Sequence, residues 1–176
     1  MKILYCLLYC GLLGILSFLL GRILPKSWFS AERFPYRSLP FEKNGKFYER
    51  FGIRKWQNRV PDMSKWFPKL MPAKKVTADF EAQLPVMIQE TCIAEFIHSL
   101  LCVAGLYCLK LWPGVGGVVF TLIYILIGNV PYILIQRYNR PRFCKLQARV
   151  HRNQKHEEVS AANGNVDFKL QYRTGA

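Results

Sequence analysis

The chain has 176 residues, of which 51% are hydrophobic and 20% are charged, and its formal net charge is +14. On a soluble domain this charge would suggest nucleic acid as a partner. Here the basic residues flank long uncharged segments, and no nucleic-acid-binding motif is present. We therefore expect membrane lipids and no nucleic acid as partners, and an all-α integral membrane protein as the fold class.

Three apolar segments predict transmembrane helices, because a spanning helix needs ~20 mostly apolar residues. Residues 3–20 and 114–135 contain no charged side chain. The middle segment, residues 96–109, reaches the required length when it is extended to 92–112, with Glu95 and Lys110 near its ends. We expect about three transmembrane helices together with amphipathic interfacial helices.

The first transmembrane helix should lie within residues 1–21. The alternative is a signal anchor or a secretory signal, since Lys2 precedes the apolar run. We expect no cleavage, because the run is longer than an ordinary signal core and no small-residue cleavage site follows it.

The basic residues also predict an orientation. Fourteen Lys and Arg side chains lie between Arg22 and Lys75, and nine follow the third apolar segment, whereas one precedes the first segment and one lies between the second and third. By the positive-inside rule, the N-terminus is outside and the long connection and the C-terminus are cytoplasmic. The expected location is the cell membrane, with several spans.

Residues 22–89 form an interfacial segment that mixes aromatic and basic side chains, as is typical of the headgroup region. The apolar positions of residues 46–60 favour an amphipathic helix. A hairpin is the alternative, because Asn44-Gly45 is a strong two-residue turn signal. Thr77, with Asp79 and Glu81, is typical of a helix start.

The remaining chain divides into a transmembrane hairpin with a polar site over residues 90–142 and a C-terminal part over residues 143–176. The periodicity of Phe143, Leu146 and Val150 predicts a basic surface helix. The polar residues 157–176, with Gly and Asn, predict a disordered tail.

Glu90, Glu95 and His98 share one side of the predicted second span. Ionisable groups at a membrane boundary are costly and are candidates for function. His98 is the candidate general base, and Glu95 or Glu90 would orient it. The structural alternative is that the glutamates end the span and that His98 is hydrogen-bonded inside the bundle. A metal site is not expected, because a second helix with the same ExxH spacing is missing.

Asn129 precedes Pro131, which cannot donate a backbone hydrogen bond and so frees an acceptor inside the third span. Asn129 is either hydrogen-bonding glue between helices or a catalytic amide. The residues that follow carry candidate donor-binding side chains, which are Arg137, Asn139, Arg140 and Arg142. In the predicted topology they share a membrane face with Glu90, Glu95 and His98.

In these positions the sequence resembles the glycosyl-4,4'-diaponeurosporenoate acyltransferase family of staphyloxanthin-type carotenoid biosynthesis. The matching stretches are residues 41–48 (FEKNGKFY), 53–56 (IRKW) and 60–62 (VPD), Glu90-Thr91 with Ala94-Glu95 and His98, and residues 129–131 (NVP) and 136–142 (QRYNRPR). The resemblance covers about residues 41–142, and the ordered set is far more specific than any single stretch. It implies transfer of a long-chain acyl group to a sugar hydroxyl of a glycosylated carotenoid acid, or of another glycolipid.

The predicted function is therefore a membrane acyltransferase. His98 would deprotonate the sugar hydroxyl, with Glu95 or Glu90 orienting it, and Asn129 would donate to the developing oxyanion. The donor would be a thioester of coenzyme A or of an acyl carrier protein, and no cofactor would be bound. Arg137, Asn139, Arg140 and Arg142, with Lys55 and Trp56, would hold the donor. The alternative is a non-catalytic membrane scaffold or a lipid-binding subunit of a biosynthetic complex.

Overall fold

The computed structural model describes residues 1–60 and 80–174, with side chains through His156. The described residues contain helices and no strand. Three helical stretches, Lys2–Ile23, Phe80–Leu111 and Val115–His156, are long and apolar enough to cross a membrane. This confirms the predicted fold class and the three spans.

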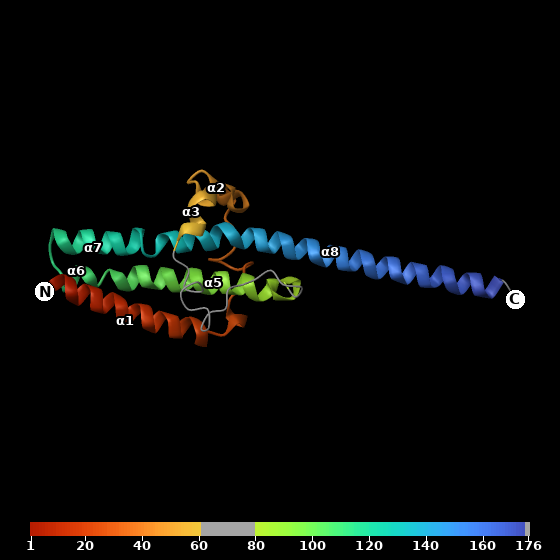
Figure 1. Cartoon of the computed structure of the whole chain (residues 1–176), viewed down its shortest axis with the longest axis horizontal. Coiled ribbons are helices and arrows are strands. Elements are labelled where there is room, and N and C mark those ends of the chain that lie inside the picture. Colours follow the sequence, from red (N-terminus) through yellow and green to blue (C-terminus); the bar gives the residue numbers. More distant parts are fainter. Residues whose placement is uncertain (61–79, 175–176) are drawn as a thin grey trace.

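Helix α1 (Lys2–Ile23), helix α5 (Phe80–Gly105) and helix α7 (Val115–Leu126) lie side by side and form the membrane bundle (Figure 1). The short helix α6 (Cys108–Leu111) joins α5 to α7, and helix α8 (Val130–Thr174) continues from α7 in nearly the same direction. The pairing of α5 with α8 is the most extensive helix contact. It brings the two predicted polar groups face to face.

A small set of buried apolar side chains fixes α1 and the segment after it against α5. Phe29 packs on Cys92, Ile93 and Ile97 of α5, and Leu20 of α1 packs on the same cluster. The outward faces of the bundle remain apolar, with large exposed side chains along α1, α5 and α7. Exposed apolar surface of this extent is what a lipid environment requires.

The segment after α1 wraps across the end of the α5–α8 pair in short helical turns. These turns are η1 (Lys26–Trp28), η2 (Pro40–Gly45), α2 (Lys46–Glu49), α3 (Ile53–Trp56) and η3 (Gln57–Arg59). Turn η1 contacts α5, whereas η2, α2 and α3 dock on α8, where Tyr48 and Ile53 pack against Tyr138 in a second cluster. The segment therefore packs against the helices of the bundle.

The prediction of one helix over residues 46–60 is wrong. Gly52 adopts a left-handed conformation with φ 64° and separates α2 from α3. The hairpin alternative is also wrong. Lys43, Asn44 and Gly45 do form a tight left-handed turn, but it joins η2 to α2. Gly45 (φ 90°) is needed there, because a Cβ atom would lie 3.0 Å from the Tyr138 carbonyl oxygen.

The expected irregularity near Pro131 is present as a break between α7 and α8. Gly128 and Asn129 lie in this break, and Pro131 falls in the first turn of α8, where a missing N–H costs little. In the C-terminal part, helix α8 runs to Thr174, so the predicted change to a disordered tail at residue 157 does not occur.

Two further features are the helix start expected near Thr77 and the state of the cysteines. The expected helix start at Thr77 and Asp79 lies outside the described residues, and α5 is described from Phe80. All six cysteines are free. Cys10 and Cys108 approach to 3.7 Å between their Sγ atoms where α1 meets α6.

Candidate functional site

The apposition of α5 and α8 places His98 against the break before α8. His98 Nδ1 lies 3.0 Å from Asn129 Oδ1. The imidazole ring also stacks on Tyr132, with ring centroids 4.5 Å apart and the planes 6° from parallel. Asn129 is buried, with 2% of its surface exposed. His98 is thus held on one side by an amide and on one face by an aromatic ring.

The second contact of Asn129 decides the tautomer of His98. Asn129 Nδ2 donates to the Tyr124 carbonyl oxygen at 3.0 Å. A carbonyl oxygen only accepts, so the amide nitrogen is fixed on that side and the amide oxygen faces His98. Nδ1 must therefore carry the proton in the neutral ring. Nε2 keeps its lone pair, and none of the described residues hydrogen-bonds it.

One helical turn away, the carboxylate of Glu95 is enclosed by two arginines from α8. Arg137 Nη1 lies 2.6 Å from one carboxylate oxygen, and Arg140 Nη2 lies 2.5 Å from the other. Glu95 and Arg140 are both almost completely buried. Breaking such a pair costs several kcal/mol, because the remaining charge is left without a partner.

Arg137 also crosses to the interfacial segment and pairs with a second buried carboxylate. Its Nε lies 2.5 Å from Glu42 Oε1, and Tyr48 donates a hydrogen bond to the same oxygen. The Leu39 N–H donates to Glu42 Oε2 at 2.7 Å. Glu42, Tyr48, Arg137, Glu95 and Arg140 form one network, which we call the arginine–carboxylate network. It ties the interfacial segment to both helices of the pair.

Two pKa shifts follow from this network. Burial acts to raise the pKa of Glu42, but hydrogen bonds from Arg137, Tyr48 and the Leu39 N–H outweigh it and leave the pKa below its usual value. Burial, together with the hydrogen bond to Glu42, raises the pKa of Tyr48 to about 12. The network therefore holds a charged carboxylate and a neutral phenol at neutral pH.

The geometry separates residues that the sequence analysis had combined. The expected pairing of Glu95 with His98 is wrong, because both Glu95 oxygens face the arginines. Glu90 pairs with Lys26 at 3.1 Å, at the end of the bundle. The charges of the two glutamates are thus directed to different elements, that of Glu90 to η1 and that of Glu95 to α8.

Of the two roles predicted for Asn129, its contacts agree with hydrogen bonding between helices. Its amide nitrogen donates to Tyr124, and its oxygen faces His98. Both ends of the amide are thus engaged inside the bundle. This geometry suits a residue that positions His98 better than one that donates to an oxyanion.

The candidate donor-binding residues fall into two groups. Arg137 and Arg140 are internal: Arg140 also donates to Thr91 Oγ1 at 2.9 Å and to the Tyr36 carbonyl at 2.7 Å. Arg142 is external, stacks on the Tyr138 ring at 3.8 Å and pairs with Glu49 at 3.1 Å. The outer group is completed by Asn139, Lys55 and Trp56, of which Trp56 donates to the Phe51 carbonyl at 3.0 Å.

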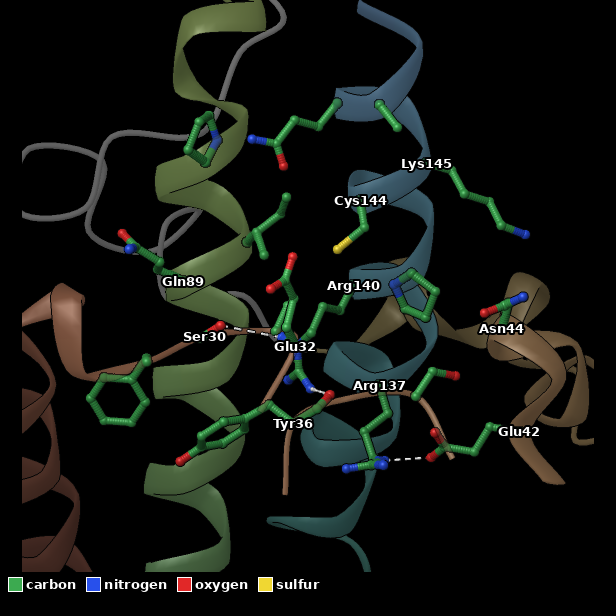
Figure 2. Close-up of a pocket in the computed structure, with 18 of the residues that line it drawn as sticks. Ser30, Glu32, Tyr36, Glu42, Asn44, Gln89, Arg137, Arg140, Cys144 and Lys145 are labelled. Atoms are coloured by element: carbon green, nitrogen blue, oxygen red, sulfur yellow. Dashed lines mark hydrogen bonds and ion pairs between the residues drawn. The ribbon is translucent and has the colours of Figure 1, made fainter. Parts of the chain in front are cut away.

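A cavity of about 780 Å³ opens between the N-terminal part of α5 and residues 137–151 of α8 (Figure 2). Arg137 and Arg140 lie at one end of it, and Cys144 and Lys145 lie farther along α8. Ser30, Glu32 and Tyr36 of the interfacial segment contribute to its wall. His98 and Asn129 do not line this cavity. The site thus has a half-buried imidazole and, on the cytoplasmic side of the predicted topology, a cavity lined by polar and apolar side chains.

Sequence reasoning missed several members of the site. Tyr132 was not singled out, although it follows Asn129 by three residues and both contact His98. Glu42 and Tyr48 were noticed only as part of the resemblance. Their pairing with Arg137 spans 95 and 89 residues of sequence, respectively, which no local pattern encodes. Among the described residues, no cluster of three His, Cys, Asp or Glu side chains could hold a metal ion.

Comparison with known proteins identifies the family. A family model described as glycosyl-4,4'-diaponeurosporenoate acyltransferase matches residues 25–149. A protein of that name from Staphylococcus aureus strain MRSA252 is 31% identical over 143 residues, which cover 81% of this chain and 86% of the relative. The corresponding protein of the bovine strain RF122 / ET3-1 is 29% identical over the same lengths. No solved structure matches significantly. The matched region contains His98, Asn129 and the whole arginine–carboxylate network, and the chain belongs to the glycosyl-4,4'-diaponeurosporenoate acyltransferase family.

Proposed function

We propose that this chain is a membrane acyltransferase that moves a fatty acyl group from an acyl thioester to a sugar hydroxyl of a glycosylated carotenoid or a similar glycolipid. Family membership supports the reaction class. The observation that carries the mechanism is the contact of His98 Nδ1 with Asn129 Oδ1 at 3.0 Å. It leaves the Nε2 lone pair free to accept a proton.

In the proposed reaction, Nε2 of His98 takes the proton of the sugar hydroxyl as the oxygen attacks the thioester carbonyl. A carbon–oxygen bond forms, and the carbonyl becomes a tetrahedral oxyanion. Its collapse breaks the carbon–sulfur bond. The thiolate that leaves takes the proton from the imidazolium, which returns His98 to its starting state. Asn129 and Tyr132 act as positioning residues, since they hold the ring and its tautomer.

The donor is proposed to be a thioester of coenzyme A or of an acyl carrier protein, approaching from the cytoplasm without a bound cofactor. Arg142, Asn139, Lys55 and Trp56 are the proposed docking groups for this donor. Arg142 keeps 42% of its side chain exposed, so its guanidinium can meet an acidic carrier surface. Arg137 and Arg140 instead hold the arginine–carboxylate network together.

Reconstitution tests this proposal directly. The purified chain in lipid nanodiscs is supplied with an acyl thioester and a glucosylated lipid acceptor, and the products are followed by mass spectrometry. We expect an acylated glycolipid and one free thiol for each acyl group transferred. Absence of transfer by folded protein with both a carotenoid and a diacylglycerol glucoside would contradict the proposal and would support a scaffold instead.

A further inference from the structure

Two of the residues that line the cavity between α5 and α8 each carry a buried polar atom that the fold does not satisfy. Arg137 Nη2 and Ser38 Oγ are both inaccessible and have no hydrogen-bond partner among the described residues. Both residues line the 780 Å³ cavity. Buried polar groups are nearly always paired, and an unpaired donor carries a desolvation penalty. Two such atoms beside one cavity indicate a place where a ligand supplies the missing partners.

The charges around Arg137 favour an uncharged ligand. Its guanidinium already faces Glu42 at 2.5 Å and Glu95 at 2.6 Å, and Glu95 is shared with Arg140. The positive charges of Arg137 and Arg140 balance the negative charges of Glu42 and Glu95. A phosphate entering this end of the cavity would approach two fixed carboxylates, which is unfavourable. A neutral oxygen would accept from Nη2 without that repulsion.

The remaining polar wall is suited to hydroxyl groups. Besides the ionisable side chains Glu32, Lys145 and His151, the wall contributes amide and hydroxyl side chains, which both donate and accept, as sugar hydroxyls do: Ser27, Ser30, Asn44, Gln89 and Gln147. Apolar side chains such as Phe29 and Ile88 complete it. Small-molecule sites combine apolar side chains with polar groups that fix the orientation of the ligand. This composition matches a sugar ring, with its polar edges and apolar faces.

The position of the cavity relative to the membrane suits the polar headgroup of an amphiphile. Arg137 reaches Glu95 on α5, and His98 lies three residues beyond Glu95, a rise of ~4.5 Å toward the membrane interior. Glu95 and His98 both contact α8. We infer that this cavity binds the glycosyl headgroup of the acceptor, with Arg137 Nη2 and Ser38 Oγ as hydrogen-bond partners and a hydroxyl directed toward His98. The inference rests on, and deepens, the proposed acyl transfer.

A binding experiment tests the inference without relying on turnover. Dodecyl β-glucoside is titrated into the full chain in nanodiscs free of sugar detergents, and binding is followed by calorimetry. Ser38→Ala removes one partner and should preserve the fold, since that hydroxyl is unsatisfied in the protein. Ala148→Trp places a large ring at an exposed position on the cavity wall. The matched controls are Ser17→Ala, whose hydroxyl bonds to Gly14 of its own helix, and Leu146→Trp, which lies off the cavity wall.

We expect Ser38→Ala to weaken glucoside binding by about three- to tenfold, the range for one lost hydrogen bond. Ala148→Trp should weaken binding by at least about tenfold, and both controls should bind like the wild type. A dodecyl chain with an ethylene-glycol head should not compete for the site. Equal binding by all four variants, or equal competition by the ethylene-glycol amphiphile, would overturn the inference.

Kinetics with two acceptors separates this inference from the proposed reaction. Ser38→Ala should raise the acceptor KM alike for a glucosyl diacylglycerol and for a glucosyl ester of a polyene acid, because the cavity contacts only their common sugar. A rise in the donor KM alone would assign the cavity to the donor and would refute the inference. Glucoside binding that depends on Ser38 in a chain without transferase activity would instead refute the proposed function and leave the sugar site standing.

Discussion

His98 and Asn129 are 31 residues apart in the sequence, and their side chains meet at 3.0 Å between Nδ1 and Oδ1. The contact joins α5 to the break that precedes α8. It fixes which imidazole nitrogen carries the proton, because the other end of the Asn129 amide donates to the Tyr124 carbonyl. Its consequences for catalysis are testable at both residues.

Replacing His98 by Gln should remove most of the turnover. General-base catalysis typically contributes ~10²- to 10⁴-fold, so kcat should fall by at least about a hundredfold. Both KM values should change little, because His98 lies outside the cavity. His156→Gln is the matched control, since it removes an exposed imidazole on α8. Near-normal turnover by folded His98→Gln protein would eliminate His98 as the base.

Replacing Asn129 by Ala should remove the hydrogen bond that fixes His98 in a single tautomer. The chain has only three histidines, so ¹⁵N spectra of histidine-labelled protein are readily assigned by comparison with His98→Gln. The wild type should show a single Nδ1–H tautomer for His98, and Asn129→Ala a mixture with lower kcat. Asn129→Asp retains an acceptor oxygen and should restore much of the tautomer preference. An unchanged spectrum in Asn129→Ala would show that the amide does not position the ring.

Arg140→Ala should act on stability rather than on donor binding. It leaves the buried Glu95 with one partner fewer, and breaking a buried ion pair costs ~3–5 kcal/mol. We expect a markedly lower Tm and less protein in the membrane. Arg142→Ala removes an exposed pair with Glu49, which is worth ~0–1 kcal/mol, and should leave Tm nearly unchanged. A normal Tm with a raised donor KM for Arg140→Ala would restore its predicted role as a donor-binding residue.

Glu42 should make the stability of the protein sensitive to acid. Its pKa is lower in the folded protein than the ordinary value of 4.5, so its contribution is present above pH 4.5 and is lost as the pH falls through the folded pKa. Thermal unfolding in nanodiscs between pH 7 and pH 3.5 should show a fall in Tm that is smaller in Glu42→Gln. Parallel curves for the two proteins would contradict this assignment.

Tyr48 should make the stability of the protein sensitive to alkaline pH. Its pKa is raised from 10.0 to about 12, so the neutral phenol contributes stability that is present below pH 10 and is lost as the pH rises through about 12. Tyr48→Phe removes both the titration and the hydrogen bond to Glu42. Its Tm should be lower at pH 8 and should depend less on pH between 9 and 11. The same alkaline dependence in both proteins would exclude Tyr48 as its source.

The predicted orientation places Asn44 in the cytoplasm and Trp112 outside. Single cysteines at these positions in a Cys-free background can be labelled in intact cells with an impermeant maleimide. We expect labelling at position 112 and not at position 44, because the interfacial segment carries most of the basic residues. The reverse pattern would show that the topology is inverted and that the cavity lies on the outer side of the membrane.

The sequence by itself determined the membrane class, the three spans and the family. Long uncharged runs such as residues 114–135 have few alternatives to a spanning helix, because lipid leaves no partner for an exposed backbone. The ordered motifs around His98, Asn129 and Arg140 were sufficient to indicate the family. These signals are local or depend only on order along the chain, so they can be read without knowing the packing.

The tertiary structure alone decided which polar groups act together. Glu95 and His98 are neighbours on α5, yet Glu95 turns to Arg137 and Arg140, and His98 turns to Asn129. A buried charge must be neutralised where it lies, and two guanidiniums from α8 do this better than a neutral imidazole. Which side chains of α8 face which turn of α5 depends on how the helices pack and on the break at Asn129. That register is a property of the folded bundle, and no spacing within either helix encodes it.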